Sequence, residues 1–469
     1  MKIKALSRSE SSTQRECSGD LRKHFCNLDP QSHPMQRARE YTRAVQGAKL
    51  ERMFAKPLVV GNLGNGHMDS ITASATSRRS LVSLVSGSAD GQIKLWDLTS
   101  RTQVAELSGG HTRAVSGLVY GLDGQSFYSC GEDGVVRLWS VNEQSISSSN
   151  NDAATTTTTT TRGPLQTWRV SSAAFKSMDH HWMDETFVTA SSESVCVWSP
   201  ERTAPLQTHK SLWGNNSHAT ISVVRYNPSE RHLLGLCTND RGVGIHDSRV
   251  GVALRKSVLR MRSNCLEWNP MEPMTFAVGN EDYQAYTFDM RRIDQPTRIY
   301  KGHVGAILSL SWSPTGREFA TGSYDRTIRI FSTTQGGTAR DVYHTKRMQR
   351  VTVVHYTNDN GYIVSGSDDT NLRLWRAVAS QPPGQQRLVR EEAALLYRQT
   401  LVKRYQHMPA VARISKARRV PNVIRKQTAA AQIQKTKADR KQSNRIQHSK
   451  PGTHRFVAER QKVVTKEIK

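Results

Sequence analysis

No stretch of the 469-residue chain approaches the roughly 18 consecutive apolar residues that a membrane-spanning helix needs. Residues 1–8 also contain no apolar run, so we expect no secretory signal. The six cysteines include no C-x-x-C pair and, in an intracellular chain, predict reduced and mostly buried thiols. Acidic residues are few, because 40 Asp and Glu face 66 Lys and Arg, for a formal charge of +26. This balance argues against an ordinary metabolic enzyme.

The excess positive charge is concentrated in the C-terminal part of the sequence. Residues 377–469 contain 22 basic and 5 acidic side chains, whereas residues 57–376 contain 32 and 29, and residues 1–56 contain 12 and 6. Lys and Arg near phosphates release condensed counterions, so this segment favours a polyanionic partner, with nucleic acid as the leading candidate. The alternative is a solvated nuclear address such as residues 416–419.

A short apolar run that ends in an aromatic residue or a histidine recurs through the middle of the chain. Its seven copies end at Trp96, Trp139, Trp198, His246, Phe288, Phe331 and Trp375. The steps between them are 43, 59, 48, 42, 43 and 44 residues, and in most copies an Asp lies six residues before the final position. Each copy contains short alternating strands joined by Gly and Asp turns, which predicts one four-stranded blade.

This repeat resembles the WD-repeat β-propeller family. The fold class is therefore predicted as all-β, a seven-bladed WD-repeat β-propeller with an extended N-terminal arm and a basic α-helical C-terminal extension. The predicted regions are the arm at 1–57, the propeller at 58–377 and the C-terminal domain at 378–469. Residues 54–60 are expected to add a strand that completes the last blade. A Ser-, Asn- and Thr-rich insert at 143–163 is expected on a surface loop.

The resemblance also implies a buried hydrogen-bonded network in several blades, formed by a Gly-His imidazole, a strand Ser or Thr, a turn Asp and a strand Trp. Its expected members are His67, Asp90 and Trp96 in the first blade, with Ser86 or Ser88, then His111, Asp133 and Trp139, then His303 and Asp325, with Ser323. Phe331 replaces the Trp of the sixth blade and has no indole N–H to donate. A Ser/His/Asp set that repeats around a ring is structural, so no catalytic, cofactor-binding or metal-ligating residue is predicted.

The flanks of the repeats resemble the Sof-type WD-repeat family. The matching residues are 1–8, 29–30, 33–34, 39–41 and 49–57 at the N-terminal side, and 343–349 and 444–452 at the C-terminal side. The resemblance implies a ribosome-biogenesis factor of the nucleus and nucleolus, a scaffold of the small-subunit processome needed for pre-rRNA processing. The implied partners are pre-rRNA, box C/D small nucleolar RNA and other processome proteins, with no cofactor, membrane or small-molecule substrate.

Charge density selects the candidate contacts to RNA or to an acidic partner. They are Lys416, Arg418, Arg419, Arg425, Lys426, Lys435, Lys437, Arg440, Lys441, Arg445 and Lys450. Helices are expected at residues 386–407 and from Pro421 toward Ile446.

An alternative function is that of a substrate receptor of a cullin-RING ubiquitin ligase. Asp247 with Arg249, and Asp289 with Arg291, form Asp-x-Arg motifs after the strand aromatic position. These motifs resemble those by which some WD-repeat proteins dock on the ligase adaptor, where an exposed Arg can pair with a partner carboxylate. The other reading is that each Asp caps a turn and each Arg faces solvent.

Overall fold

The computed structural model describes residues 29–107, 109–141, 163–169, 174–210, 220–251, 253–334, 336–381, 389–450, 452–454 and 457–468. Nearly all of the predicted insert, and residues 1–8, lie outside these ranges. Contacts divide the chain into two compact units: residues 58–377 with 419–469, and residues 1–57 with 378–418. The predicted C-terminal domain is thus shared between the two units.

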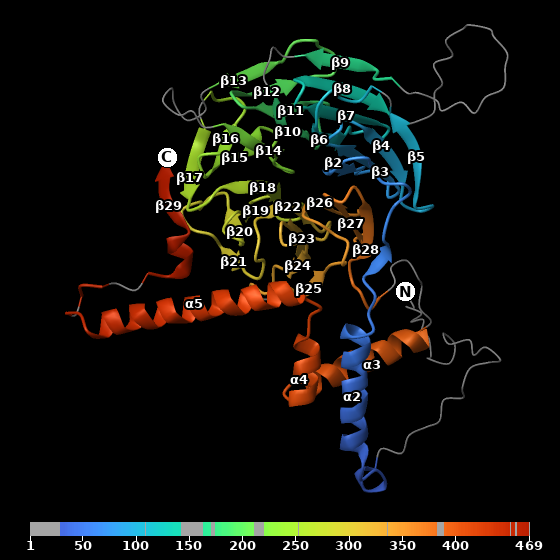
Figure 1. Cartoon of the computed structure of the whole chain (residues 1–469), viewed down its shortest axis with the longest axis vertical. Helices are drawn as coiled ribbons and strands as arrows, with labels where there is room; N and C mark the ends of the chain where they lie inside the picture. The colour runs from blue at the N-terminus through green and yellow to red at the C-terminus, as the bar shows by residue number, and fades with distance from the viewer. Residues whose placement is uncertain are drawn as a thin grey trace, which may run out of the picture. The chain divides into compact units, whose positions relative to one another are not determined.

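The larger unit contains seven antiparallel sheets, the blades, arranged around a ring (Figure 1). Blades one to four contain β2 (Ile71–Thr76), β3 (Ser83–Ser88), β4 (Ile93–Asp97), β5 (Thr102–Leu107); β6 (Val115–Tyr120), β7 (Ser126–Gly131), β8 (Val135–Ser140), β9 (Gln166–Arg169); β10 (Phe175–His180), β11 (Phe187–Ser191), β12 (Ser194–Trp198), β13 (Gln207–Lys210); β14 (Ile221–Tyr226), β15 (Leu233–Thr238), β16 (Gly242–Asp247) and β17 (Ala253–Leu259). Blades five to seven contain β18 (Ser263–Trp268), β19 (Thr275–Asn280), β20 (Ala285–Asp289), β21 (Arg298–Tyr300); β22 (Ile307–Trp312), β23 (Glu318–Ser323), β24 (Ile328–Ser332), β25 (Asp341–Tyr343); β26 (Val351–Tyr356), β27 (Tyr362–Ser367) and β28 (Leu372–Arg376). We call the strands of each blade a, b, c and d from the centre outward.

The ring closes as the sequence predicts. Strand β1 (Leu58–Val60) pairs antiparallel with β28, with Leu58 opposite Trp375, and so supplies the outer strand of blade seven. The N-terminal and C-terminal ends of the repeat region thus share one sheet. This confirms the prediction of a seven-bladed propeller with a strand from residues 54–60.

The core lies between neighbouring blades, where the c-strand aromatic residues are almost fully buried. In blade two the Trp139 ring stacks on Phe127 with centroids 6.3 Å apart, and in blade three Trp198 stacks on Phe187 at 6.1 Å. The outermost strand β5 instead alternates exposed and half-buried residues. Burial on both faces explains why b and c strands are apolar runs, whereas edge strands are mixed.

The smaller unit is helical. It contains the 3-10 turn η1 (Pro30–Ser32), α2 (Gln36–Arg52), α3 (Val389–Arg404) and α4 (Pro409–Lys416). Ala44 and Ala48 of α2 share one apolar cluster with Leu401, Val411 and Ile414. The sequence predicts an extended arm at residues 1–57, and over residues 36–52 the structure corrects this to a helix. Small and apolar residues at helical spacing give this segment a face that α3 and α4 bury.

The C-terminal part of the larger unit begins with α5 (Asn422–Gln447), which agrees with the helix predicted after Pro421. It continues through the 3-10 turn η2 (Glu459–Lys462) to β29 (Val464–Ile468). Strand β29 pairs antiparallel with β17 and makes blade four a five-stranded sheet (Figure 1). No helix in the described ranges is both long and apolar enough to span a membrane.

Candidate nucleic-acid and protein interfaces

Blade two contains a complete chain of buried hydrogen bonds between its strands. The Trp139 indole donates to Ser129 Oγ over 2.9 Å, and Ser129 Oγ lies 2.9 Å from His111 Nε2. His111 Nδ1 lies 3.0 Å from Asp133, whose carboxylate also accepts the Val135 N–H. Burial lowers the pKa of His111, so the ring is neutral near pH 7 and donates its Nδ1 proton to Asp133. Every polar group of this set is used inside the blade, which is the arrangement of a structural network.

The sixth and first blades depart from this pattern. In blade six His303 Nδ1 lies 2.9 Å from Asp325, but its Nε2 meets Thr321 at 2.7 Å. The expected Ser323 instead donates to the Gly305 and Ala306 carbonyls, so that assignment is corrected: only the b-strand residue that faces the imidazole can reach it. In blade one Ser86 links His67 and Trp96, at 2.5 and 2.7 Å.

Asp90 does not join the network of blade one. It is exposed and accepts the Gln92 N–H, while His67 Nδ1 is buried with no hydrogen-bond partner among the described residues. Burial and the charge of Lys94 lower the pKa of His67 to about 4, so its imidazole is neutral. Position in the turn therefore does not guarantee that an Asp reaches its imidazole.

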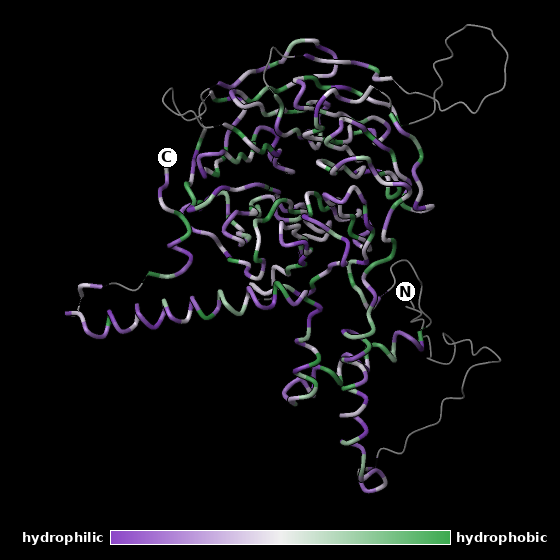
Figure 2. The backbone as a smooth tube through the Cα atoms, viewed as in Figure 1, coloured by the Kyte–Doolittle hydropathy of each residue, from purple (hydrophilic) through white to green (hydrophobic). Residues whose placement is uncertain are grey.

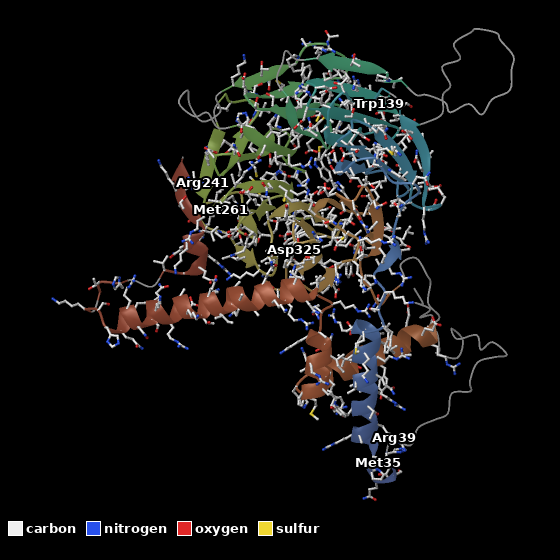
Figure 3. The ribbon with its side chains drawn as sticks, viewed as in Figure 1. Met35, Arg39, Trp139, Arg241, Met261 and Asp325 are labelled. Carbon is white, nitrogen blue, oxygen red and sulfur yellow. The ribbon has the colours of Figure 1, made fainter. Side chains whose placement is uncertain are left out.

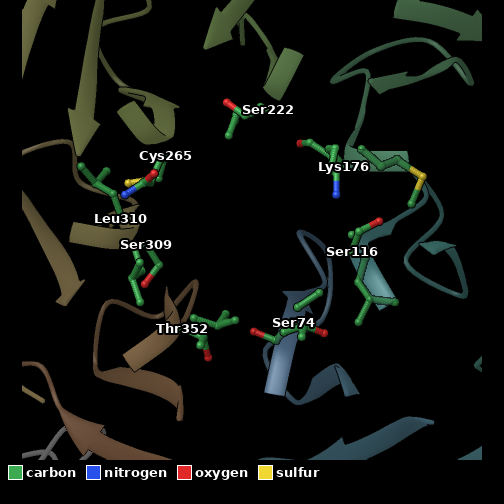
Figure 4. A pocket seen from close by; sticks show the side chains of 18 of the residues that line it. Ser74, Ser116, Lys176, Ser222, Cys265, Ser309, Leu310 and Thr352 are labelled. Carbon is green, nitrogen blue, oxygen red and sulfur yellow. The ribbon is translucent and has the colours of Figure 1, made fainter. Parts of the chain in front are cut away.

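The innermost strands of all seven blades line a central cavity of about 200 Å³ (Figure 4). Two of its hydroxyl groups join neighbouring blades, because Thr72 donates to the Val115 carbonyl and Thr352 to the Ile71 carbonyl, each over 2.5 Å. Ser222 donates to Cys237 within its own sheet. The hydroxyl groups of Thr72 and Thr352 therefore connect blade one to blades two and seven. No group of three metal-ligating side chains occurs in the described ranges.

Charged side chains converge from the fifth positions of three inner strands. Asp179 of blade three lies 3.7 Å from Arg225 of blade four and 3.9 Å from Arg78. Glu267 of blade five accepts the Trp312 backbone N–H over 2.7 Å. Burial raises the pKa of Glu267 to about 7, although the Arg225 charge opposes the shift. The Asp179–Arg225 pair joins consecutive blades, whereas the Asp179–Arg78 pair joins blade three to the turn that follows β2 of blade one.

The two Asp-x-Arg motifs occupy equivalent turns between strands c and d of blades four and five. Arg249 Nη2 lies 2.8 Å from Asp247, and Arg291 Nε lies 3.3 Å from Asp289. Each Asp also accepts the backbone N–H of its Arg, so it caps the turn. The Arg side chains are 66% and 69% exposed, and Arg255 of β17 donates to the Arg291 carbonyl across the two blades. The motif therefore presents two ordered guanidinium groups on adjacent turns.

Helix α5 holds most of the candidate RNA contacts and is hydrophilic along most of its length (Figure 2). At 3.6 residues per turn, Lys426, Lys437, Arg440 and Lys441 lie on one side, and all are exposed. The opposite side contains Ile424, the one buried residue of the helix. We call the four exposed cations the α5 cationic face.

One of the predicted contacts is already paired on that opposite side. Lys435 Nζ lies 2.6 Å from Glu459 Oε1, and Glu459 also pairs with Lys301, at the end of blade five. Hydrogen bonds from the two lysines lower the pKa of Glu459 to about 2. Lys435 thus links α5 to the end of blade five through Glu459.

The remaining candidates are distributed around the ends of the helices. Lys416 ends α4, and Arg418 is half-buried because it donates to the Ser415 and Ala417 carbonyls. Arg419, Arg425, Arg445 and Lys450 are exposed. Lys416 and Arg418 belong to the smaller unit and the rest to the larger one. Strand β29 is not among the elements predicted from the sequence, although the β-branched residues at 463–465 are a strand signal.

The fold and its repeats define a WD-repeat β-propeller protein with a Sof1-like C-terminal region. The WD domain, G-beta repeat description matches residues 60–97, 101–140, 294–332 and 342–376, and the Sof1-like domain description matches residues 377–464. The chain belongs to the family that includes Protein SOF1 and DDB1- and CUL4-associated factor 13.

Relatives match over almost their full lengths. The chain is 37% identical to Protein SOF1 of Saccharomyces cerevisiae, over 99% of this chain and 94% of that protein. It is 39% identical to DDB1- and CUL4-associated factor 13 of Homo sapiens, over all of both chains, and 38% identical to the Xenopus laevis protein of that name, over 99% of both.

Proposed function

We propose that the protein is a non-catalytic scaffold of ribosome assembly, a component of the small-subunit processome that acts in pre-rRNA processing in the nucleolus. Pre-rRNA, box C/D small nucleolar RNA and other processome proteins are its partners. The observation that carries the proposal is the α5 cationic face, whose four exposed cations lie on the side of the helix opposite Lys435 and Ile424. A cationic helix held on a rigid ring suits a phosphate backbone.

We assign no catalytic step to the protein, because polar side chains inside the blades are already hydrogen-bonded to one another. The His, Ser and Asp side chains, a set also found in hydrolases, are hydrogen-bonded to one another inside blades, as in blade two. A propeller offers turns at both ends of its blades and the outer edges of its sheets for partners, which fits a large ribonucleoprotein particle.

The test is crosslinking and sequencing of RNA bound to the full-length protein in cells. We compare wild type with a variant in which Lys426, Lys437, Arg440 and Lys441 are changed to Glu. The control changes two other cations, Arg231 and Arg317, to Glu; both are exposed in turns between strands a and b. Loss of pre-rRNA and small nucleolar RNA tags with the α5 variant alone supports the proposal. Equal recovery of these RNA tags from all three proteins would contradict a role of α5 in RNA binding.

A second function, docking on the adaptor of a cullin-RING ligase, is favoured by the paired turns of blades four and five. Arg249 and Arg291 are both exposed and both ordered by an Asp of the same turn. Relatives of the chain are named for association with DDB1 and CUL4. The double change Arg249→Ala with Arg291→Ala should abolish adaptor co-purification and leave particle association intact. Arg292→Ala, which removes a neighbouring exposed charge, is the control.

A further inference from the structure

The turns between strands b and c share an unusual backbone position. In blades one and two the turn Asp is followed by Gly91 and Gly134, with φ of 87° and 72°. In blades four to six the same position is held by Arg241, Tyr283 and Arg326, with φ of 69°, 70° and 64°. Thr370 of blade seven has φ of 69°. One left-handed position is thus glycine on one side of the ring and a large polar side chain on the other.

Large side chains are disfavoured at this position. A left-handed backbone brings Cβ close to the following carbonyl oxygen, which glycine avoids. A residue held in such a conformation is strained, and strain of this kind clusters at functional sites. Three consecutive blades thus place Arg, Tyr and Arg at a position where glycine would fit better.

In each of these turns the Asp and the residue that follows it have different surroundings. Each carboxylate is paired within its own blade, Asp240 with Lys256, Asp282 with Tyr286 and Asp325 with His303. The residues that follow them face outward, and Tyr283 is 49% exposed. The cations therefore lie in solvent while the neighbouring carboxylates are occupied.

Other cations and a second tyrosine lie beside these turns. Arg241 Nη1 reaches the Arg260 carbonyl at 3.5 Å, which places the exposed Arg260 and Met261 next to it (Figure 3). Tyr324, 58% exposed, follows b-strand β23 of blade six, and the Arg350 guanidinium lies 6.0 Å from its ring. The connections that enter blades five and seven thus extend the surface of the b–c turns.

We propose that this surface, which we call the b–c face, binds single-stranded RNA through Arg241, Arg260, Tyr283, Tyr324, Arg326 and Arg350. The guanidinium groups of Arg241, Arg260 and Arg326 take phosphates in bidentate hydrogen bonds, and the two exposed phenol rings stack on bases. Arg350 is held beside Tyr324 by an ion pair with Asp368, whose Oδ2 lies 2.9 Å from Arg350 Nε, and it contributes as a neighbour of that ring. The rings favour RNA over an acidic peptide, because stacking needs a planar partner for each ring. The proposal rests on the proposed function for its ligand class, but it places a second RNA contact on the propeller itself.

The test measures the affinity of the full-length chain for a fluorescein-labelled 16-nucleotide oligouridine RNA over a series of salt concentrations. The variant combines Arg241→Gly, Tyr283→Gly and Arg326→Gly, changes that relieve the backbone and so preserve folding. We expect Kd to rise roughly tenfold or more, and the slope of log K against log salt to fall by about two, one for each lost phosphate contact.

Two matched controls come from the same fold. Thr370→Gly changes the same turn position in blade seven without removing a charge or a ring. Arg101→Gly removes an exposed left-handed Arg with φ of 61° in the c–d turn of blade one, at the other end of strand β4. Both controls should leave Kd and the salt slope within twofold of wild type.

The outcomes separate this proposal from the previous one. The proposal for the b–c face is supported if the affinity for RNA falls in the b–c variant but not in its two controls. A further fall in affinity when the charges of the α5 cationic face are also reversed supports it as well. Unchanged affinity of the b–c variant overturns it, and in that case a loss with the α5 variant alone keeps the proposed function. A loss of affinity for an oligoglutamate peptide without a loss for RNA assigns the face to an acidic protein and overturns it as well.

Discussion

The Tyr405 hydroxyl donates a 2.8 Å hydrogen bond to Glu40 Oε2, a carboxylate that lies 365 positions earlier in the chain. Arg404 Nη1 reaches the same oxygen at 3.2 Å, so two consecutive residues at the C-terminal end of α3 contact α2 through one side chain. The Glu40 side chain is 12% exposed and lies next to the apolar cluster of Ala44 and Leu401. A segment before the propeller and a segment after it therefore form one folded unit.

Glu40→Ala should loosen that unit. It leaves Tyr405 and Arg404 without their shared acceptor at the α2–α3 contact, and hydrogen bonds to a charged group are among the stronger ones. We expect amide hydrogen exchange in α3 to quicken on the order of tenfold, while exchange in the blades is unchanged. Glu51→Ala, on the exposed end of the same helix, is the control; an equal response of both variants contradicts this role of Glu40.

Two equivalent turn residues should differ in their effect on stability. Asp133, whose side chain is 7% exposed, holds His111 and the Thr112 and Val135 backbone, whereas the exposed Asp90 holds the Gln92 N–H. Asp133→Ala should lower the free energy of unfolding by about 2–3 kcal/mol, since it leaves a buried imidazole N–H unpaired. Asp90→Ala should cost less than about 1 kcal/mol. Chemical denaturation measures both, and equal losses would show that burial does not set the difference.

The raised pKa of Glu267, about 7, predicts a particular pH dependence. Because the folded state binds this proton more tightly than the unfolded chain does, Glu267 makes stability fall as pH rises from about 4.5 to 7. His67 and His355, whose pKa values burial lowers to about 4, act in the opposite sense below pH 6.5. The difference in the free energy of unfolding between Glu267→Gln and wild type reports the contribution of this carboxyl group. This difference should favour the variant by about 1–3 kcal/mol more at pH 8 than at pH 5.

The left-handed turn position should respond to substitution by size and branching. Arg326→Gly should leave the free energy of unfolding unchanged or raise it by up to about 1 kcal/mol, because strain relief competes with the added freedom of the unfolded chain. Arg326→Val should lower it by about 1–2 kcal/mol, since a branched Cβ is least compatible with φ of 64°. Thermal unfolding distinguishes these results, and a destabilised glycine variant would mean that the Arg side chain stabilises the fold.

Strand β29 should detach when its apolar contact is lost. Val463 is 8% exposed and packs in the cluster that contains Leu259 and Ile293. Val463→Asp should speed amide exchange in β17, where Lys256 and Val258 face β29 in the ladder, by about tenfold or more. Val457→Asp, at a residue that is 37% exposed, should have no such effect.

Much of this protein could be predicted from local pattern. The spacing of Trp96, Trp139 and Trp375 defines the blades because each blade repeats the same alternation of strands and turns. The helix after Pro421 and the closing strand at Leu58 also follow from short-range signals. The partner of His303 could not be chosen between Thr321 and Ser323, because that choice depends on which b-strand side chain faces the imidazole.

The blades and the concentration of positive charge after residue 377 follow from the amino-acid sequence alone, since periodicity and charge are properties of neighbouring residues. The pairing of β29 with blade four and the packing of α2 with α3 and α4 are visible in the three-dimensional structure and not in the repeat pattern. The segments that pair in these two cases lie some 200 positions or more apart, and they are held together by the complementarity of their surfaces. Such long-range contacts depend on the packing of the whole chain, which no local pattern specifies.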